Sequence, residues 1–329
     1  MDDTIPAGFE VVELEPKRVI DLWFEDGNVV IQAEDYQFCL FKSFLTTRSP
    51  IFADTFSIPQ PEEAERINGC PVLRIHDSAT DAAHFFKAIF DSETFLPPPT
   101  QTTFEKVAAI LRLSTKYEVG YLRKRALAHL SSGYPTTLAA WRADDPGLNT
   151  ATFPVLPSDA LATINLAREV ACPWVLPTAL YDYVKSTGPS EIFSGTLQDG
   201  VLLQLSAADK RLCLEARETQ REASKDLETF LTALIPEDCT SADGACLSSR
   251  LVWMRYLNKL RQDGFWLDPT EVWDHWDVFG THVCTPCLLE CEKKYEDARQ
   301  AVWLSIPAMF NLPSWSELEA ERRKALEEL

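Results

Sequence analysis

The sequence lacks every pattern that would place it in or across a membrane. It has no apolar run close to the roughly 20 residues that a membrane-spanning helix needs. Its first ten residues, MDDTIPAGFE, are acidic and do not follow the charged-then-apolar order of a signal peptide. No Asn-x-Ser/Thr acceptor for N-glycosylation occurs. We therefore expect a protein of the cytoplasm and/or the nucleus that does not bind membranes.

The common catalytic and nucleotide-binding signatures are also absent. The sequence contains no G-x-x-x-x-G-K-S/T, G-x-G-x-x-G, G-x-S-x-G or H-E-x-x-H. It has only five histidines, and His84 and His129 fall in helical patterns, where a histidine is usually structural. An enzyme with a cysteine-based site is the remaining catalytic alternative. No pattern places a histidine or an asparagine beside a cysteine, so we expect a protein that is not an enzyme.

Positive charge is scarce. The 31 Lys and Arg residues face 50 Asp and Glu residues, which gives a formal net charge of −19. A phosphate backbone or an anionic membrane surface would repel such a chain. The basic runs Leu122 to Arg125 and Arg322 to Lys324 lie in helical patterns and are predicted to be solvated helix faces. Nucleic acid is therefore not expected among the partners.

Two domains are expected, because 329 residues exceed what one hydrophobic core usually organises. Apolar residues make up 46% of the chain, which is ample for packed cores. After Trp141 the sequence becomes rich in Asp, Pro, Gly and Thr, as linkers are. We predict an acidic N-terminal segment over residues 1–18, an α+β domain over 19–141, a linker over 142–157 and a mostly α-helical domain over 158–329.

The segment 26–56 predicts a β-hairpin followed by a helix. Apolar residues alternate over 29–31 and again over 36–40, with Glu34 and Asp35 at the reversal. After the second stretch the apolar period lengthens from two to about 3.6 residues. The residues that continue this helical stripe are Phe41, Leu45, Ser49 and Phe52. One helix is therefore expected directly after the hairpin.

The order hydrophobic-x-x-hydrophobic-Lys-x-x-Leu-x-x-x-Ser-x-x-Phe in this segment resembles the signature of the BTB/POZ domain. The family's later units follow in order as a strand over 70–76, a capped helix over 79–90, and helices that cover 104–115 and 119–130. The resemblance spans Phe24 to Leu130. DGNVVIQAED, PEEAERINGCPV and the segment from Tyr134 to Leu138 further resemble a group of fungal BTB-domain proteins.

The resemblance implies that this part of the chain binds other proteins. Dimeric BTB transcription factors line a charged pocket with an Asp at the first strand and a basic residue at the first helix. Here Asn28 stands where the Asp is usual, Phe41 stands where a His is common, and Lys42 keeps the basic position. Lys42 is thus the residue to which the resemblance assigns partner binding.

We accordingly predict a non-enzymatic interaction protein that self-associates as a homodimer or docks a partner. Some BTB proteins act as substrate adaptors by binding the cullin scaffold of a ubiquitin ligase, so a cullin is a candidate partner. The loop over 57–69 has no clean match to the hydrophobic-x-Glu element that cullin-binding members often show. A transcription-associated regulator that acts through protein partners is the alternative, and the chain has no basic DNA-binding module.

The second half predicts helices separated by prolines and loops, and its strand patterns are weak. Ser316 with Glu319 is a capping-box pair for the last helix. The six expected helical stretches are 159–170, 177–185, 206–234, 248–262, 288–303 and 316–329. Tryptophan is frequent here, and Trp266, Trp273 and Trp276 have the spacing of a helix face. We expect these rings to fill a core, with an exposed binding groove as the alternative.

Nine cysteines scattered over a chain of this size do not form a disulfide framework, which also favours a reducing compartment. Four of them form two loop pairs, Cys239-x6-Cys246 and Cys284-x-x-Cys287. Two such pairs can supply four thiolates to a structural zinc ion, about 2.3 Å from each sulfur. Unliganded thiols at helix ends and a redox C-x-x-C are the alternatives. The zinc hypothesis requires the four sulfurs to converge to within about 4 Å of one another.

Overall fold

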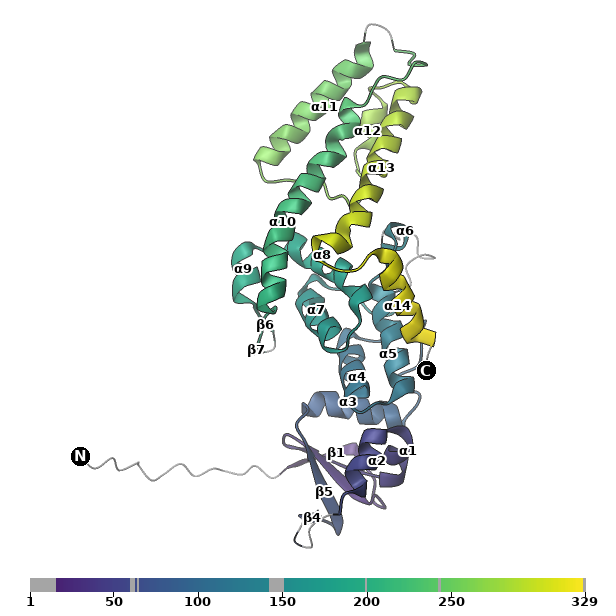
Figure 1. The fold of residues 1–329 in the computed structure, drawn as a ribbon, viewed down its shortest axis with the longest axis vertical. Helices are drawn as coiled ribbons and strands as arrows, with labels where there is room; N and C mark the ends of the chain where they lie inside the picture. Colours follow the sequence, from purple (N-terminus) through teal and green to yellow (C-terminus); the bar gives the residue numbers. More distant parts are fainter. Residues whose placement is uncertain are drawn as a thin grey trace, which may run out of the picture. The chain divides into compact units, whose positions relative to one another are not determined.

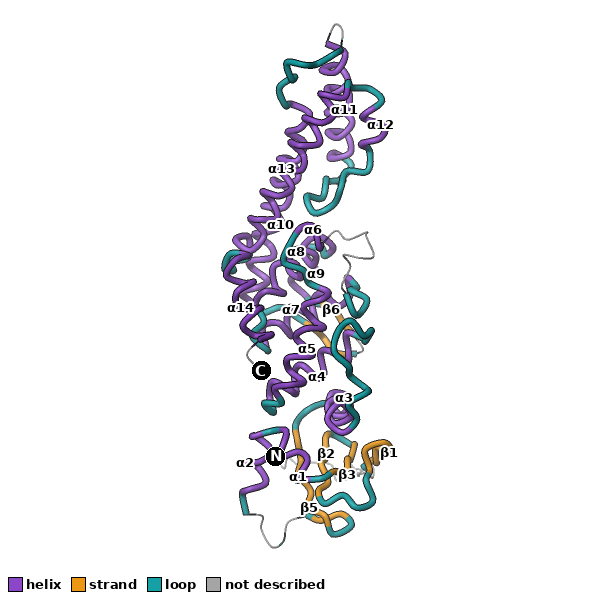
Figure 2. Tube along the Cα trace, turned by 90° about the vertical axis from the view of Figure 1, so that its right-hand side faces the viewer, coloured by secondary structure: helices purple, strands orange, loops and turns teal. Residues whose placement is uncertain are grey.

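The computed structural model describes residues 16–59, 63, 65–141, 151–198, 200–241 and 244–327. It divides into two compact units (Figure 1). The first comprises the described parts of Met1–Pro97 and Glu105–Ala126, and the second comprises those of Pro98–Phe104 and Leu127–Leu329. Figure 2 shows the main sheet in the first unit, whereas the second is mostly helical. None of the described helices has the length and apolar content that crossing a membrane would require.

A five-stranded sheet of order β1-β3-β2-β5-β4 forms one layer of the first unit. The predicted hairpin is confirmed, because β2 and β3 pair antiparallel with Val29 opposite Leu40 and Ile31 opposite Phe38. Glu34 adopts φ 49° at the reversal. The pairs β1–β3 and β2–β5 are parallel, and β4 pairs antiparallel with β5. The strands are β1 (Lys17–Trp23), β2 (Val29–Ala33), β3 (Tyr36–Leu40), β4 (Arg66–Ile67) and β5 (Cys70–Ile75).

The sequence pattern missed β1 and β4. The acidic segment was expected to extend to residue 18, but β1 begins at Lys17. Strand β1 lies at the edge of the sheet with Leu22 buried and Ile20 87% exposed, so it lacks the buried alternation that marks an inner strand. β4 has two residues and lies in the stretch that was predicted to be a loop. Both strands are mostly exposed, so neither has the alternation of apolar residues by which a strand is predicted from sequence.

The single helix expected after the hairpin is wrong, because the chain forms two. α1 (Lys42–Arg48) ends at Ser49, and α2 (Pro50–Ser57) starts immediately after it. A residue that precedes proline is driven out of the helical region, and Ser49 accordingly has φ −139° and ψ 118°. The helices α3 (Ala79–Phe90), α4 (Phe104–Lys116) and α5 (Gly120–Gly133) follow close to the predicted positions.

Ser49 joins the two helices to the centre of the first unit. Its buried hydroxyl donates to the carbonyl of Tyr117 over 2.5 Å and accepts from the backbone N–H of Phe52 over 3.1 Å, which caps α2. The ring of Phe52 stacks on Tyr117 with centroids 4.6 Å apart and planes 7° from parallel. Tyr117 Oη in turn donates to Asp77 over 2.6 Å, ahead of α3. One small side chain thus connects three helices.

The second unit contains the predicted helices and three short elements that the pattern missed. The predicted helices are α7 (Ala160–Glu169), α8 (Leu176–Ser186), α10 (Ala207–Leu227), α11 (Ala245–Gln262), α13 (Thr285–Met309) and α14 (Trp315–Glu327). Two short helices and a hairpin are additional: α9 (Pro189–Ser194), α12 (Trp276–Gly280), and β6 (Thr196–Gln198) with β7 (Val201–Leu203). α6 (Leu138–Trp141) precedes the predicted linker. These elements are three to six residues long, too short for a hydrophobic period.

The cap of the last helix corrects the sequence prediction. Ser314, and not Ser316, bonds with a glutamate three residues on, because its hydroxyl and its backbone N–H both contact Glu317 Oε2, at 2.6 and 2.8 Å. Glu319 instead accepts from the hydroxyl of Thr136 over 2.9 Å. Both pairs satisfy the capping-box spacing in sequence, so the spacing alone did not identify the start of the helix.

Part of the predicted linker packs into the second unit. Residues 142–150 lie outside the described part of the chain. Beyond them, Thr152 and Phe153 are buried. The Thr152 hydroxyl is 2.7 Å from Nδ1 of the fully buried His129, which bears out a structural role for this histidine. Thr152 also accepts the backbone N–H of Thr102 over 2.8 Å.

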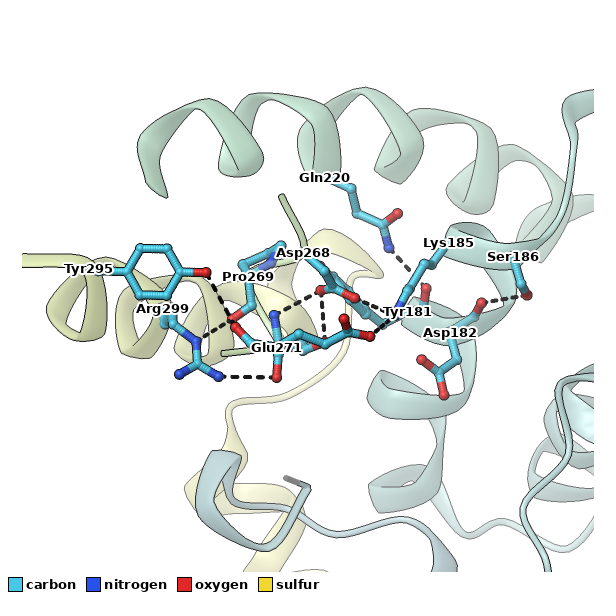
Figure 3. A network of polar contacts seen from close by, with 11 residues as sticks. Tyr181, Asp182, Lys185, Ser186, Gln220, Asp268, Pro269, Glu271, Tyr295 and Arg299 are labelled. Atoms are coloured by element: carbon cyan, nitrogen blue, oxygen red, sulfur yellow. Dashed lines mark hydrogen bonds and ion pairs between the residues drawn. The ribbon is translucent and has the colours of Figure 1, made fainter. Parts of the chain in front are cut away.

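A polar network holds the segment 263–275 between helices (Figure 3). Buried Arg299 on α13 donates to the carbonyls of Pro269 and Thr270 over 3.3 and 3.2 Å. On the α8 side, Lys185 pairs with Asp268 and with Glu271, the latter over 2.8 Å. A loop without regular hydrogen bonds is thereby fixed through its carbonyls and carboxylates, as buried backbone requires.

Substituting Ser49 by Ala tests the centre of the first unit. The change removes a helix cap and a buried hydrogen bond, each worth about 1 kcal/mol, so we expect a loss of about 2 kcal/mol in the free energy of unfolding of this unit. Urea unfolding followed by circular dichroism measures it. Ser57→Ala is the matched control, because Ser57 is exposed and bonds only to the Asp54 carbonyl. Equal effects of the two substitutions would contradict the assignment.

Substituting Asp182 by Asn tests the network of Figure 3 through its pH dependence. Burial raises the pKa of Asp182 to about 7; nearby Lys185 opposes the rise, and Asp268 and Glu271 add to it. The folded protein therefore binds this proton more tightly than the unfolded chain, and ionisation costs stability as the pH rises from about 4 to 7. D182N should unfold at a higher temperature than the parent at pH 8 and at the same temperature at pH 4. D297N, on the exposed face of α13, should show no such difference.

Candidate metal centre

The two cysteine pairs come from the starts of two helices and from the loop before one of them. Cys246 lies in the first turn of α11, and Cys239 lies in the loop that precedes it. Cys284 is the N-cap of α13, and Cys287 lies in its first turn, with Pro286 between them. A C-x-x-C that spans a helix start points both sulfurs to one side of the N-terminus, because the cap is extended and the next residues are helical.

The four sulfurs converge. Sγ of Cys239 lies 3.6 Å from that of Cys284 and 3.5 Å from that of Cys287, and all four sulfurs lie within 4.8 Å of one another. Four sulfurs about 2.3 Å from a tetrahedral zinc ion would be about 3.8 Å apart. These two pairs meet the 4 Å that the sequence hypothesis requires, and the full set meets it only to within 4.8 Å. These residues could therefore hold a structural zinc ion.

The surroundings favour a thiolate at Cys284. The backbone N–H of Cys284 points at Sγ of Cys246 over 3.2 Å. Burial opposes ionisation of Cys284, but hydrogen bonds from the backbone N–H groups of Cys287 and Thr240, together with the neighbouring thiols, lower its pKa to about 6. Burial and the same neighbours raise the pKa of Cys287. Four thiols this close cannot all ionise by themselves, and a divalent cation is the natural compensation.

An aromatic core adjoins the four cysteines. Phe230, Trp273 and Phe279 are buried there, with Trp273 and Phe230 centroids 5.1 Å apart. Trp253 and Trp276 pack against the same core, so the expectation that the tryptophans fill a core is confirmed for this group. Trp273 precedes α12 and does not lie on the predicted helix face. Cys291 belongs to this core too, because its thiol donates to the Phe230 carbonyl over 3.5 Å.

The two histidines that precede the second cysteine pair in the sequence, His275 and His282, do not lie with the four sulfurs. His275 pairs with Asp274 over 3.0 Å, and His282 is exposed, so neither joins the four sulfurs. All nine cysteines are free thiols. The redox alternative uses only the C-x-x-C pair and does not explain why Cys239 and Cys246 converge on it. Sequence spacing indicated the right four residues, but the loop-and-cap placement that brings them together was not visible in it.

Lys42, the candidate for partner binding, lies at the first turn of α1 and is partly buried. Its backbone N–H donates to Asn28 Oδ1 over 2.8 Å, so Asn28 caps the helix. Its ammonium group lies 5.6 Å from the centre of the Phe56 ring. No ion pair joins Lys42 to any carboxylate among the residues that the structure describes. At this position the chain has a neutral cap and a cation–π contact, and not the charged Asp–basic pair that dimeric BTB transcription factors have.

Cobalt binding tests the capacity of the site. Metal-free protein titrated with Co²⁺ should develop the intense thiolate-to-cobalt absorption of a tetrahedral four-sulfur site, saturating at one ion per chain. C287S should lose this band because a hydroxyl does not replace a thiolate. C70S is the control, since Cys70 bonds to the Gly27 carbonyl and lies outside the cluster. Identical spectra from C287S and C70S would exclude the four-sulfur site.

Comparison with known proteins adds no relative. No protein-family model matches this chain, and neither the curated proteins nor the solved structures contain a match. The resemblance of the N-terminal segment to the BTB/POZ domain therefore stays a prediction that rests on residues of this chain.

Proposed function

We propose that the chain is a non-enzymatic interaction protein whose first unit is a BTB/POZ-type module that self-associates or docks a partner, and whose helical unit is stabilised by a zinc ion. The observation that carries the proposal for the first unit is the Ser49 centre. The signature residues Leu45, Ser49 and Phe52 are all buried. Ser49 ties them to Tyr117, which lies between the helices that the resemblance predicted over 104–115 and 119–130.

The edge of the sheet supports self-association. Strand β1 pairs with β3 only through Lys17, Arg18 and Trp23, with an irregularity between them, and its other edge has no partner strand among the described residues. Ile20 lies in the middle of this strand with 87% of its surface exposed. An unpaired edge strand with an exposed β-branched apolar residue is a template for a second strand. A homodimer that pairs or covers β1 would bury Ile20.

The zinc proposal follows from what the four thiols can do chemically. A site with four thiolate ligands has no open coordination position, so it stabilises structure and does not activate water. Here it would tie the starts of α11 and α13 to the loop around Cys239. Its contribution would be folding free energy of the helical unit. This agrees with an interaction protein, and it gives the cluster no catalytic role.

Self-association is tested by sedimentation at micromolar concentration. The parent protein should sediment as a dimer, and I20D should shift it to a monomer because a carboxylate would be buried at the pairing edge. I58D is the matched control: Ile58 is 62% exposed but follows α2 and lies outside the sheet. A monomeric parent would refute the dimer. Titration with a purified cullin N-terminal domain then decides between partner docking and no docking by this unit.

The zinc proposal is tested on protein purified without chelator. Elemental analysis should give one zinc per chain, and removing the metal should lower the unfolding temperature of the helical unit. C239S should contain no zinc, whereas C70S should keep one. If the parent carries no zinc but unfolds at the same temperature after chelation, the four thiols are unliganded. That result would leave the dimer proposal untouched, because β1 belongs to the other unit.

A further inference from the structure

Helix α11 carries a charge pattern opposite to that of the chain. Over its 18 residues it has four basic side chains, Arg250, Arg255, Lys259 and Arg261, and no acidic one, in a chain of net charge −19. Two of these are accounted for within the fold. Arg250 is buried and donates to the Ala233 carbonyl, and Arg261 pairs with Glu228. The remaining two lie on the outer side of the helix.

The exposed side of α11 carries apolar residues along both of its flanks. Figure 1 shows α11 at the margin of the helical unit, with α10 and α13 on one side of it. The exposed apolar residues of this face are Leu247 (48%), Leu251 (44%), Val252 (61%) and Tyr256 (41%). At 100° per residue, Arg255 and Lys259 lie between two apolar pairs, Leu247 with Leu251 on one flank and Val252 with Tyr256 on the other. Both cations are exposed, and neither forms an ion pair with a described carboxylate. The face thus combines apolar residues at helical spacing with two positive charges that the fold leaves unneutralised.

A groove of about 460 Å³ adjoins this face, lined by Ser249, Val252, Trp253, Tyr256 and His282. The rings of Trp253 and Tyr256 stand perpendicular, with centroids 5.5 Å apart, so they form two walls of a corner. His282 closes the groove from the segment that leads into Cys284. A concave aromatic corner fits an inserted apolar side chain, which is how one anchor residue docks a helix.

We propose that the outer face of α11 with this groove binds an acidic amphipathic helix of a partner protein. One apolar side chain of the partner would enter the Trp253–Tyr256 corner, and carboxylates on the flank of the same helix would meet Arg255 and Lys259. Charge complementarity selects an acidic partner, because the two cations are unpaired. The surface belongs to the helical unit and is independent of the dimer proposed for β1.

An anionic bilayer fits these observations less well than a helix does. Basic amphipathic helices do bind such membranes, but they do so with many cations and a flat apolar face. Here only two free cations border the face, and a net charge of −19 opposes approach to an anionic surface. A bilayer also offers no discrete side chain to fill a walled groove. The bilayer is therefore an outcome of the test below, and the helix is the proposal.

The experiment uses full-length protein and a designed fluorescent peptide of about 18 residues, long enough for five helical turns. Leu or Phe occupies positions i, i+4, i+7 and i+11 of the peptide, and Glu flanks this stripe. Fluorescence anisotropy should show saturable binding that weakens with salt. The double variant R255E/K259E should weaken it about tenfold or more, as expected for loss of two complementary charges. V252D should weaken it by a similar factor by charging the apolar face.

Matched variants separate this surface from general effects of charge. K293E/K294E reverses two exposed lysines on α13, and L304D charges an exposed leucine of that helix that is 61% accessible. Both should change the peptide affinity less than twofold. A peptide in which every Glu is replaced by Lys should not bind the parent. Each variant should match the parent in its circular dichroism spectrum and in its unfolding temperature, which shows that loss of binding is not loss of folded structure.

Several results would overturn the proposal. Equal binding of the Glu and Lys peptides, or no effect of R255E/K259E, would remove the charge argument. Protein that sediments with phosphatidylserine vesicles while ignoring the peptide would assign the face to membranes. Tighter binding of a peptide of residues 1–15 of this chain than of the designed helix would assign the face to an internal segment. Self-association abolished by V252D but not by I20D would assign it to a second copy.

In each case the zinc content and the effect of I20D are measured separately. The proposals for the metal and for β1 are therefore tested independently of this one.

Discussion

The starts of α11 and α13 meet at four sulfur atoms. Cys246 and Cys284 are in contact through a backbone N–H, and Cys239 touches both sulfurs of the C-x-x-C. The aromatic core of Phe230, Trp273 and Phe279 adjoins this point, because Val283 and Leu288, on either side of the C-x-x-C, pack against it. The direction in which α11 leaves the unit, and hence the position of its apolar face and of His282, depends on how these four groups are held.

The loop 263–275 illustrates a second way of fixing chain that has no regular structure. Arg299 is almost fully buried and uses its guanidinium to satisfy two loop carbonyls and Glu296. A buried guanidinium costs desolvation free energy unless its donors are used, so its position is tightly specified. Trp273 reaches the core from this loop. The placement of the aromatic core thus depends on a polar contact made on the other side of the loop.

How much of this could be read from the sequence depends on the length of the pattern. The apolar stretches of β2 and β3 are strong signals because four of the five residues in each strand are buried. The long periods of α10 and α13 are strong because each helix buries a face over several turns. The break at Ser49 follows from Pro50, because the residue before a proline is kept out of the helical region. A count of hydrophobic spacing alone does not include this steric rule and therefore predicted one continuous helix. Ser314 and Ser316 each have a glutamate three residues on, so choosing between them needed the helix start itself. The cysteine spacing identified the four residues that converge, but not that Cys284 is the N-cap of α13 while Cys246 and Cys287 lie in the first turns of their helices. The sequence does not distinguish the exposed apolar residues of α11 from its buried ones. The packing of other segments decides which side of the helix is covered.

The cysteine cluster has a consequence for the unfolded chain. Cys239 and Cys287 are 48 positions apart, and an ion bound to both would cross-link the segment between them. A link that closes a loop of this length removes about 4 kcal/mol of chain entropy from the unfolded ensemble, by the reasoning used for disulfides. All of α11 and α12 lies inside that loop. With the ion bound, the segment that contains these two helices would gain less chain entropy on unfolding. Local unfolding of α11 and α12 would therefore be less favourable than in the metal-free protein.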